Sequence, residues 1–201
     1  MVFCPMAVFK EKTIMKKFVC IPNNLATLAL FAVISILLGS CRKDEYSPMS
    51  ATQENNRILI TCNDETGKDL LSNKEFAAAV SAFGNESQAM LPCQMKQIKG
   101  KSYLLISADL PNRKNIKFSA NRTQGTATTE ITLKIHKQKV TLKCVFQYQD
   151  MSKPPMPIGS HTSITIESIT LDRRTIKRSG KNVVNDGLVL ALQIDPKGNI
   201  H

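Results

Sequence analysis

Apolar and polar residues alternate with a period of two over long stretches of this chain, and no other feature restricts its fold as strongly. The longest run is 140–148, where Val, Leu, Cys, Phe and Tyr take every second position. Residues 58–62 and 131–135 repeat the pattern with Ile, Leu and Cys. Successive side chains of a strand point to opposite faces of a sheet, so the alternation predicts half-buried strands of an antiparallel sheet.

Further stretches have strand character with a less regular pattern; they are 91–98, 103–108, 115–118, 163–171 and 188–194. Within 163–171 the isoleucines change phase halfway, and a β-bulge near Ser168 would return them to the inward face. Residues 188–194 are apolar on both sides of the alternation, which predicts a strand that is covered on both faces.

One segment breaks the alternation and has helical signals. Ser72 and Glu75 have the spacing of a capping box, and Gly84 stands where a helix would stop. Helical intervals separate the apolar residues Phe76, Ala79, Val80 and Phe83. The pattern predicts a short helix here, while a competing interpretation makes 79–83 an edge strand.

Eight candidate strands joined by short polar turns, with one short helix, indicate an all-β domain. We expect an antiparallel β-sandwich, immunoglobulin-like or related, over residues 57–201. An immunoglobulin domain in the strict sense is disfavoured, because it would place a core Trp between two cysteines and the chain has no Trp.

The amino-terminal part has the order of a secretory signal. Lys16 and Lys17 precede the apolar stretch 25–38, which ends at Gly39, Ser40 and Cys41. A membrane-spanning helix is the alternative. It needs roughly 20 apolar residues, and the stretch reaches that length only by including Pro22 and the two asparagines that follow it.

The residues Leu38, Gly39, Ser40 and Cys41 resemble the lipobox of bacterial lipoproteins. The resemblance implies cleavage just before Cys41 and lipid on its sulfur and on the new amino terminus, which gives effectively permanent attachment to a membrane. The charged residues 42–45 are similar to the export signal of surface lipoproteins in the Bacteroidetes group, although a solvated stub of tether would look the same.

These observations predict three segments of the chain and a cellular location. Residues 1–40 form a signal peptide, 41–56 a lipidated cysteine with a flexible tether, and 57–201 the folded domain. The expected location is the bacterial outer membrane, with the domain on the cell surface.

Three further cysteines, Cys62, Cys93 and Cys144, lie on predicted inward faces. Core thiols are the ordinary interpretation, because a free cysteine behaves as a small buried hydrophobe. A disulfide between Cys62 and Cys144 is the alternative. There is no Cys-x-x-Cys and no histidine at ligand spacing, so we expect neither a metal site nor a cofactor.

The chain carries a net charge of +11, and its densest basic cluster comprises Arg173, Arg174, Lys177, Arg178 and Lys181. Together with the lysines of 96–101, or with the basic residues of 113–117, this cluster could form a surface for acidic polysaccharide, lipid phosphate or an acidic envelope protein. Nucleic acid is not expected as the partner of an exported domain. A solvated basic hairpin is the alternative.

Signals for catalysis are weak. The Gly-x-Ser-x-Gly elbow is absent, and Glu130 and Glu167 are the only acids in mid-strand positions, both on predicted outward faces. They could serve glycoside cleavage only if they faced one cleft with carboxyl groups about 5 to 9.5 Å apart. We therefore expect a lipid-anchored protein with a non-catalytic role in binding, adhesion or assembly, with a glycan-active enzyme or accessory subunit as the alternative.

Overall fold

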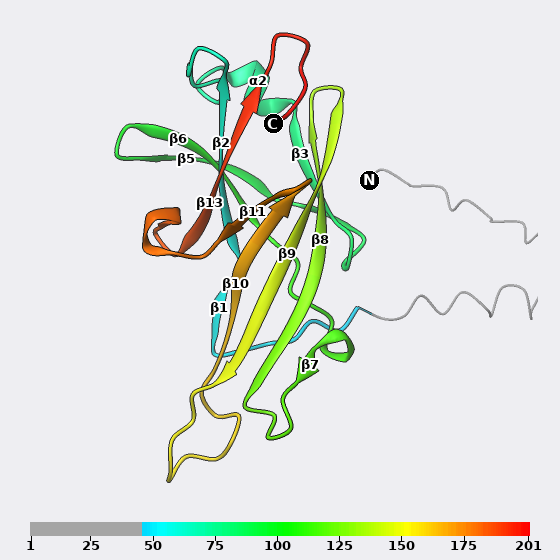
Figure 1. Ribbon diagram of the computed structural model, residues 1–201, viewed down its shortest axis with the longest axis vertical. Helices are drawn as coiled ribbons and strands as arrows, with labels where there is room; N and C mark the ends of the chain where they lie inside the picture. Colours follow the sequence, from blue (N-terminus) through cyan, green and yellow to red (C-terminus); the bar gives the residue numbers. More distant parts are fainter. Residues whose placement is uncertain (1–45) are drawn as a thin grey trace, which may run out of the picture. The chain divides into compact units, whose positions relative to one another are not determined.

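The computed structural model describes residues 46–201 (Figure 1). The predicted signal peptide, the lipobox with Cys41 and the charged residues 42–45 lie outside the described residues. Within the described part, no helix combines the length and the hydrophobicity needed to cross a bilayer.

The described residues form two β-sheets and little helix. The larger sheet has eight strands: β1 Gln53–Asn55, β3 Val80–Gly84, β4 Ala89–Leu91, β7 Lys117–Phe118, β8 Gln124–Ile135, β9 Gln138–Asp150, β10 Thr162–Leu171 and β11 Arg174–Lys177. The smaller sheet has five: β2 Arg57–Asp64, β5 Cys93–Ile98, β6 Lys101–Ser107, β12 Val183–Val184 and β13 Gly187–Ile194. The helical elements are α2 Lys74–Ala78 and two single turns, η1 Arg113–Asn115 and η2 Gly180–Asn182.

The larger sheet runs in the order β1-β10-β9-β8-β3-β4, with β11 also paired to β10 and β7 to β8, and the smaller sheet in the order β12-β13-β2-β6-β5. Most neighbours are antiparallel, as the alternation predicts. Two pairs are parallel, β1 with β10 and β13 with β2. The sheets are therefore mixed, a detail that periodicity cannot predict because the two pairing directions share the same period.

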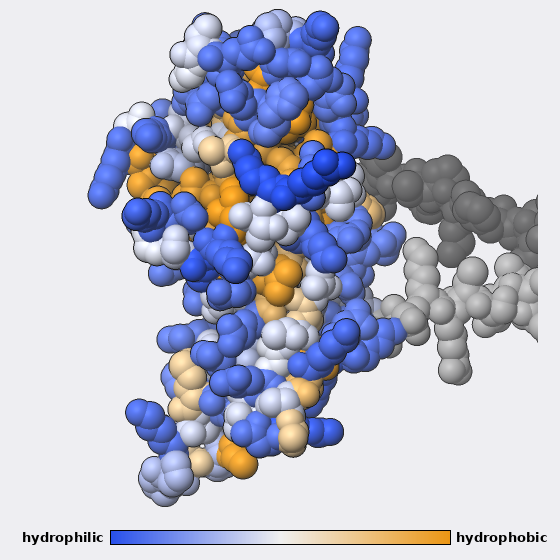
Figure 2. Space-filling view, viewed as in Figure 1, coloured by the Kyte–Doolittle hydropathy of each residue, from blue (hydrophilic) through white to orange (hydrophobic). Residues whose placement is uncertain are grey.

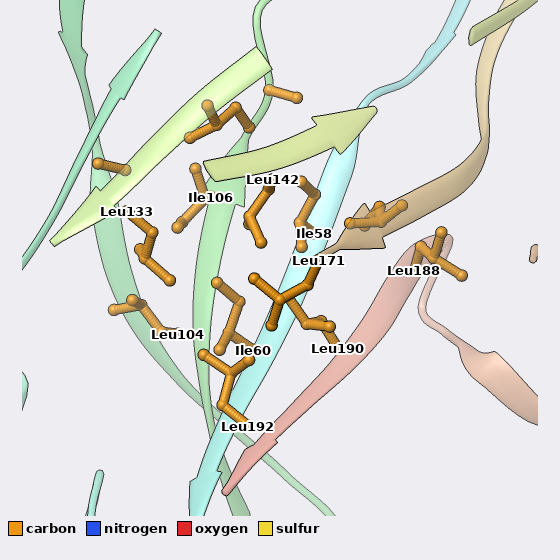
Figure 3. Packing of buried hydrophobic residues seen from close by; sticks show 14 of the residues in the cluster. Ile58, Ile60, Leu104, Ile106, Leu133, Leu142, Leu171, Leu188, Leu190 and Leu192 are labelled. Atoms are coloured by element: carbon orange, nitrogen blue, oxygen red, sulfur yellow. The ribbon is translucent and has the colours of Figure 1, made fainter. Parts of the chain in front are cut away.

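The inward faces of both sheets form one hydrophobic core. Every second residue of β9 from Leu142 to Phe146 is buried, as expected, and so are Ile58 and Ile60 of β2 and Leu190 of β13. Figure 3 shows side chains from the two sheets packed against one another. The fold is thus all-β and sandwich-like.

The predicted bulge is confirmed. The register between β9 and β10 shifts between Ile166 and Ser168, so that Glu167 is the extra residue. Ile166 and Ile169 are both fully buried on either side of the shift. The bulge therefore keeps the inward face continuous, as the change of phase in the sequence requires.

The predicted helix is shorter than expected and has a different cap. The side chain of Asn73, rather than that of Ser72, accepts hydrogen bonds from the backbone N–H groups of Glu75 and Phe76. The helix ends at Ala78, and β3 begins at Val80. Strand β3 lies between β8 and β4, so the competing strand interpretation holds for this half of the segment, but not as an edge.

Residues 46–56, which the sequence predicts to be part of a flexible tether, are instead packed against the domain. Tyr46 donates its hydroxyl hydrogen to the carbonyl oxygen of Leu110 at 2.9 Å, and β1 pairs with β10. Thr52 exchanges hydrogen bonds with Thr162, including one of 2.6 Å to its carbonyl oxygen. The packed part of the chain therefore extends back to Tyr46 instead of starting at Arg57. The polar composition of this segment hid a role in which backbone pairing, not apolar burial, provides the contacts.

Strand β13 is covered on one face only. Its inward residues Leu188, Leu190 and Leu192 are buried, whereas Ala191 and Gln193 on the outward face are exposed. The prediction of a strand covered on both faces is wrong. The outward face of the smaller sheet instead carries apolar residues in contact with solvent.

Candidate functional site

A groove of about 720 Å³ lies on the outward face of the smaller sheet. Its apolar floor is formed by Tyr103 of β6, Val184 of β12, and Val189 and Ala191 of β13. The register places these strands side by side, since β13 pairs with both β12 and β2 and β2 pairs with β6. Figure 2 shows exposed apolar atoms bordered by hydrophilic ones where Figure 1 draws β5, β6 and β13.

Four cationic side chains line the groove. Arg174 and Lys177 come from β11, Lys181 from η2 and Lys101 from the start of β6. We call these four residues and the apolar floor the basic groove. Among the described residues that line it there is no Asp or Glu, and none of the four cations is in an ion pair with another described residue. The three lysines therefore have no acidic neighbour in the described lining of the groove, which favours an anionic ligand, whereas Arg174 also lines an adjoining hollow with Asp64 and Glu65.

The basic groove continues into two smaller hollows. The first, of about 400 Å³, shares Lys101, Tyr103 and Val184 with it and adds Ile98 and Lys99. The second, of about 240 Å³, shares Ile98 with the first and is lined further by two cations, Arg57 and Lys96. Basic residues thus follow the groove along the β5–β6 hairpin.

Two arginines of the predicted cluster hold the groove wall in place. The Arg174 guanidinium donates a hydrogen bond to the carbonyl oxygen of Ala191, which ties β11 to β13. Arg178 donates to the carbonyl oxygen of Asp186 at 2.8 Å, in the turn between β12 and β13. Because carbonyl oxygens carry partial negative charge, these contacts partly use the two guanidinium groups before any ligand binds.

The predicted patch is therefore divided by the structure. Arg174, Lys177 and Lys181 line the basic groove, while Arg173 and Arg178 do not. Of the two partner sets that the sequence suggested, the lysines of 96–101 join the groove and its extensions. Arg113 and Lys117 lie instead on η1 and β7, which belongs to the larger sheet.

The floor of the groove was missed from the sequence. From the sequence alone, Val189 and Ala191 indicate that a second layer covers the strand 188–194. The same apolar positions are also what an uncovered binding face would show. The sequence predicts that Tyr103 lies in a strand, but only the tertiary structure shows that it lines the groove.

The two mid-strand acids lie on different strands of the larger sheet. Glu130 lies on β8 opposite Lys143, and Glu167 lies at the bulge of β10, with β9 between the two strands. Strand spacing and register place their Cα atoms roughly 13 Å apart on an open sheet face. Neither acid lines the basic groove. This geometry gives the enzyme hypothesis no support.

The cysteines of the described chain are free, with Cys62 and Cys144 buried and Cys93 half-buried. Burial raises the pKa of the Cys62 thiol to about 12, and burial also raises that of Cys144 to about 12. Thiols with such high pKa values are poor nucleophiles at neutral pH. They serve as core residues, and the alternative of a Cys62–Cys144 disulfide is not what the structure contains.

The carboxylate of Asp64 stabilises the backbone of its turn. One oxygen of Asp64 accepts hydrogen bonds from the backbone N–H groups of Thr66 and Lys68 and from the Thr66 hydroxyl, which lowers the pKa of Asp64. Within residues 46–201 there is no group of three or more His, Cys, Asp or Glu side chains placed to hold a metal ion.

Comparison with known proteins adds no assignment. No protein-family model, no curated protein and no solved structure matches this chain.

Proposed function

We propose that this protein is a lipid-anchored lipoprotein of the bacterial outer membrane whose surface-exposed domain, a β-sandwich of immunoglobulin-like or related topology, has a non-catalytic binding role. The lipobox-like sequence that ends at Cys41 supports the anchor. The basic groove supports the binding role, with an acidic polysaccharide or an acidic envelope protein as the partner class.

The basic groove is the observation that carries the binding role. A sheet that only had to support the fold would gain nothing from gathering Lys101, Lys177 and Lys181 around partly exposed aliphatic residues, because like charges repel and exposed apolar area is unfavourable. A ligand with negative charges removes both costs on binding. No such advantage is visible for catalysis, since the mid-strand acids are separated by a strand.

Substitution of the anchor residue tests the proposal. In a bacterial host that processes lipoproteins, the Cys41→Ala variant should lose incorporation of labelled fatty acid and leave the membrane fraction. One acyl chain binds a membrane only marginally and several chains bind it stably, so loss of all chains should release the protein.

The matched control is Cys93→Ala, which removes a half-buried thiol of the folded domain and should keep both the label and the membrane location. Membrane partition that is unchanged in Cys41→Ala would contradict the proposal and favour a spanning helix. Release of both variants would point instead to misfolding.

A further inference from the structure

The cations of the basic groove come from two walls, which separate segments of the chain form. Lys177 and Lys181 lie on the segment that runs from β11 through η2, and Lys101 lies at the start of β6. The hydrogen bonds of Arg174 and Arg178 fix the first wall against β13 and the turn before it. The strands of the smaller sheet hold the second wall. The charges are therefore placed by the fold and not by one flexible loop.

A ligand of this groove has to combine negative charge with apolar surface along its length. The cations line the groove while Tyr103, Val184, Val189 and Ala191 form its floor. The adjoining hollows add Lys99 and then Lys96 in the direction of the β5–β6 hairpin. An extended polyanion carries negative groups along its length and can therefore contact cations in the groove and in the adjoining hollows.

Three other kinds of polyanionic or acidic ligand fit less well. Single-stranded nucleic acid is bound on aromatic stacking platforms, and the only ring in the described lining, that of Tyr103, is 7% exposed. A lipid needs an enclosed apolar cavity for its acyl chains. This groove is open, and Thr175, Ser179 and Asn182 interrupt its apolar lining.

An acidic peptide is commonly recognised by strand addition at a free sheet edge or by clusters of arginine. The floor of the groove is mainly a sheet face, and only Val184 of its four residues comes from an edge strand, β12. Its one described arginine, Arg174, already donates to the carbonyl oxygen of Ala191. Lysines act as point charges that tolerate many anion geometries, which suits a chain whose negative groups recur at intervals.

From these contacts we infer that the basic groove binds an acidic polysaccharide, with its negative groups on Lys101, Lys177 and Lys181 and the apolar faces of its sugar rings on the accessible aliphatic part of the floor, Val184, Val189 and Ala191. The inference deepens the proposed function and rests on it for the setting in which such a polymer is met. Arg173 and Arg178, although part of the basic run in the sequence, have no role in this binding.

Binding of polygalacturonate by the full-length protein in detergent tests the inference. The triple variant Lys101→Gln, Lys177→Gln and Lys181→Gln should weaken binding about tenfold, because three exposed charge contacts each contribute a few-fold. Binding by the unsubstituted protein should also weaken as salt rises, since screening shortens the reach of exposed charges. Neutral dextran should not bind.

A second triple variant serves as the matched control. Lys137→Gln, Lys139→Gln and Lys153→Gln removes the same total charge from exposed positions outside the groove and should change the affinity less than twofold. Equal losses in both triple variants would overturn the inference, because binding would then follow net charge and not the groove. Absence of polygalacturonate binding, or tighter binding to DNA or to phosphatidylglycerol vesicles, would overturn it as well.

Failure of the proposed function is measured separately. Protein that carries no lipid but binds polygalacturonate through the groove would refute the anchor and leave this inference intact. Lipidated protein with no groove-dependent binding would refute this inference and leave the anchor intact.

Discussion

At the scale of single residues, the buried thiols show how the core uses cysteine. Cys62 of β2 and Cys144 of β9 are both completely buried in the shared core. Desolvation penalises the thiolate form of each, and the pKa of each rises from 9.0 to about 12. These side chains therefore behave as small apolar groups up to alkaline pH.

The raised pKa values predict a loss of stability at high pH. The folded state favours the protonated thiols, so their contribution is complete below the unfolded pKa of about 9 and is lost as the pH rises from 9 towards 12. Each thiol should cost about 1 kcal/mol of the free energy of unfolding by pH 10. Denaturant titrations at pH 8 and pH 10 under reducing conditions measure this loss.

The control for that titration is the double variant Cys62→Ala and Cys144→Ala. It should be less stable at pH 8, because it leaves small cavities, and should lose less between pH 8 and pH 10 than the unsubstituted protein. An identical pH slope in both proteins would show that other groups cause the alkaline loss.

At the scale of elements, the segment 72–84 shows a contest between helix and strand. Helical spacing of apolar residues is present, and the helix does begin after a capping side chain, that of Asn73. It stops at Ala78 because Val80 and Ala82 are buried on the inward face of β3, where they pair with Ile135 and Leu133 of β8. Tertiary pairing thus overrides local propensity after one turn of helix.

Removal of the cap tests this assignment. Asn73→Ala removes the acceptor of two backbone N–H groups and should lower the free energy of unfolding by about 1 kcal/mol. Chemical denaturation measures the change. Ser72→Ala is the comparison, because the Ser72 hydroxyl donates to the carbonyl oxygen of Asp69 and does not cap the helix. A larger loss in Ser72→Ala than in Asn73→Ala would restore the capping box that the sequence suggests.

At the scale of the whole molecule, the amino-terminal segment of the described chain provides an edge strand of the larger sheet. Strand β1 pairs in parallel with the first half of β10, and β11 pairs with the second half. The backbone of Met49 also donates to the carbonyl oxygen of Pro111 at 2.9 Å. Residues 46–56 are therefore a structural part of the domain, which changes where a soluble form of it should begin.

Two shortened chains test this boundary. A chain that begins at Tyr46 should unfold with a higher free energy than one that begins at Arg57, by at least about 2 kcal/mol, because several hydrogen bonds to the domain are lost, each worth about 1 kcal/mol. Thermal and chemical unfolding of the two chains gives the difference. Equal stability would mean that residues 46–56 act only as a tether.

Local pattern by itself predicted much of the domain. The alternation in 140–148 and 131–135 predicted β9 and β8, and the change of phase near Ser168 predicted the bulge of β10, because side-chain period and burial are linked along one strand. The lipid anchor at Cys41 is likewise predicted from the sequence alone, by the lipobox-like residues at the end of the leader. It remains a prediction.

The tertiary structure decided the candidate site. Lys101 and Lys177 are far apart in the chain and belong to different sheets, and only the packing of β11 of the larger sheet against β13 of the smaller sheet brings them to one groove. The sequence of β13 does not show whether a second layer covers its apolar residues, since the same apolar residue types occur in a core and on a binding face. Local periodicity records which side of a strand is apolar, and only the packing of distant segments determines what, if anything, lies against that side.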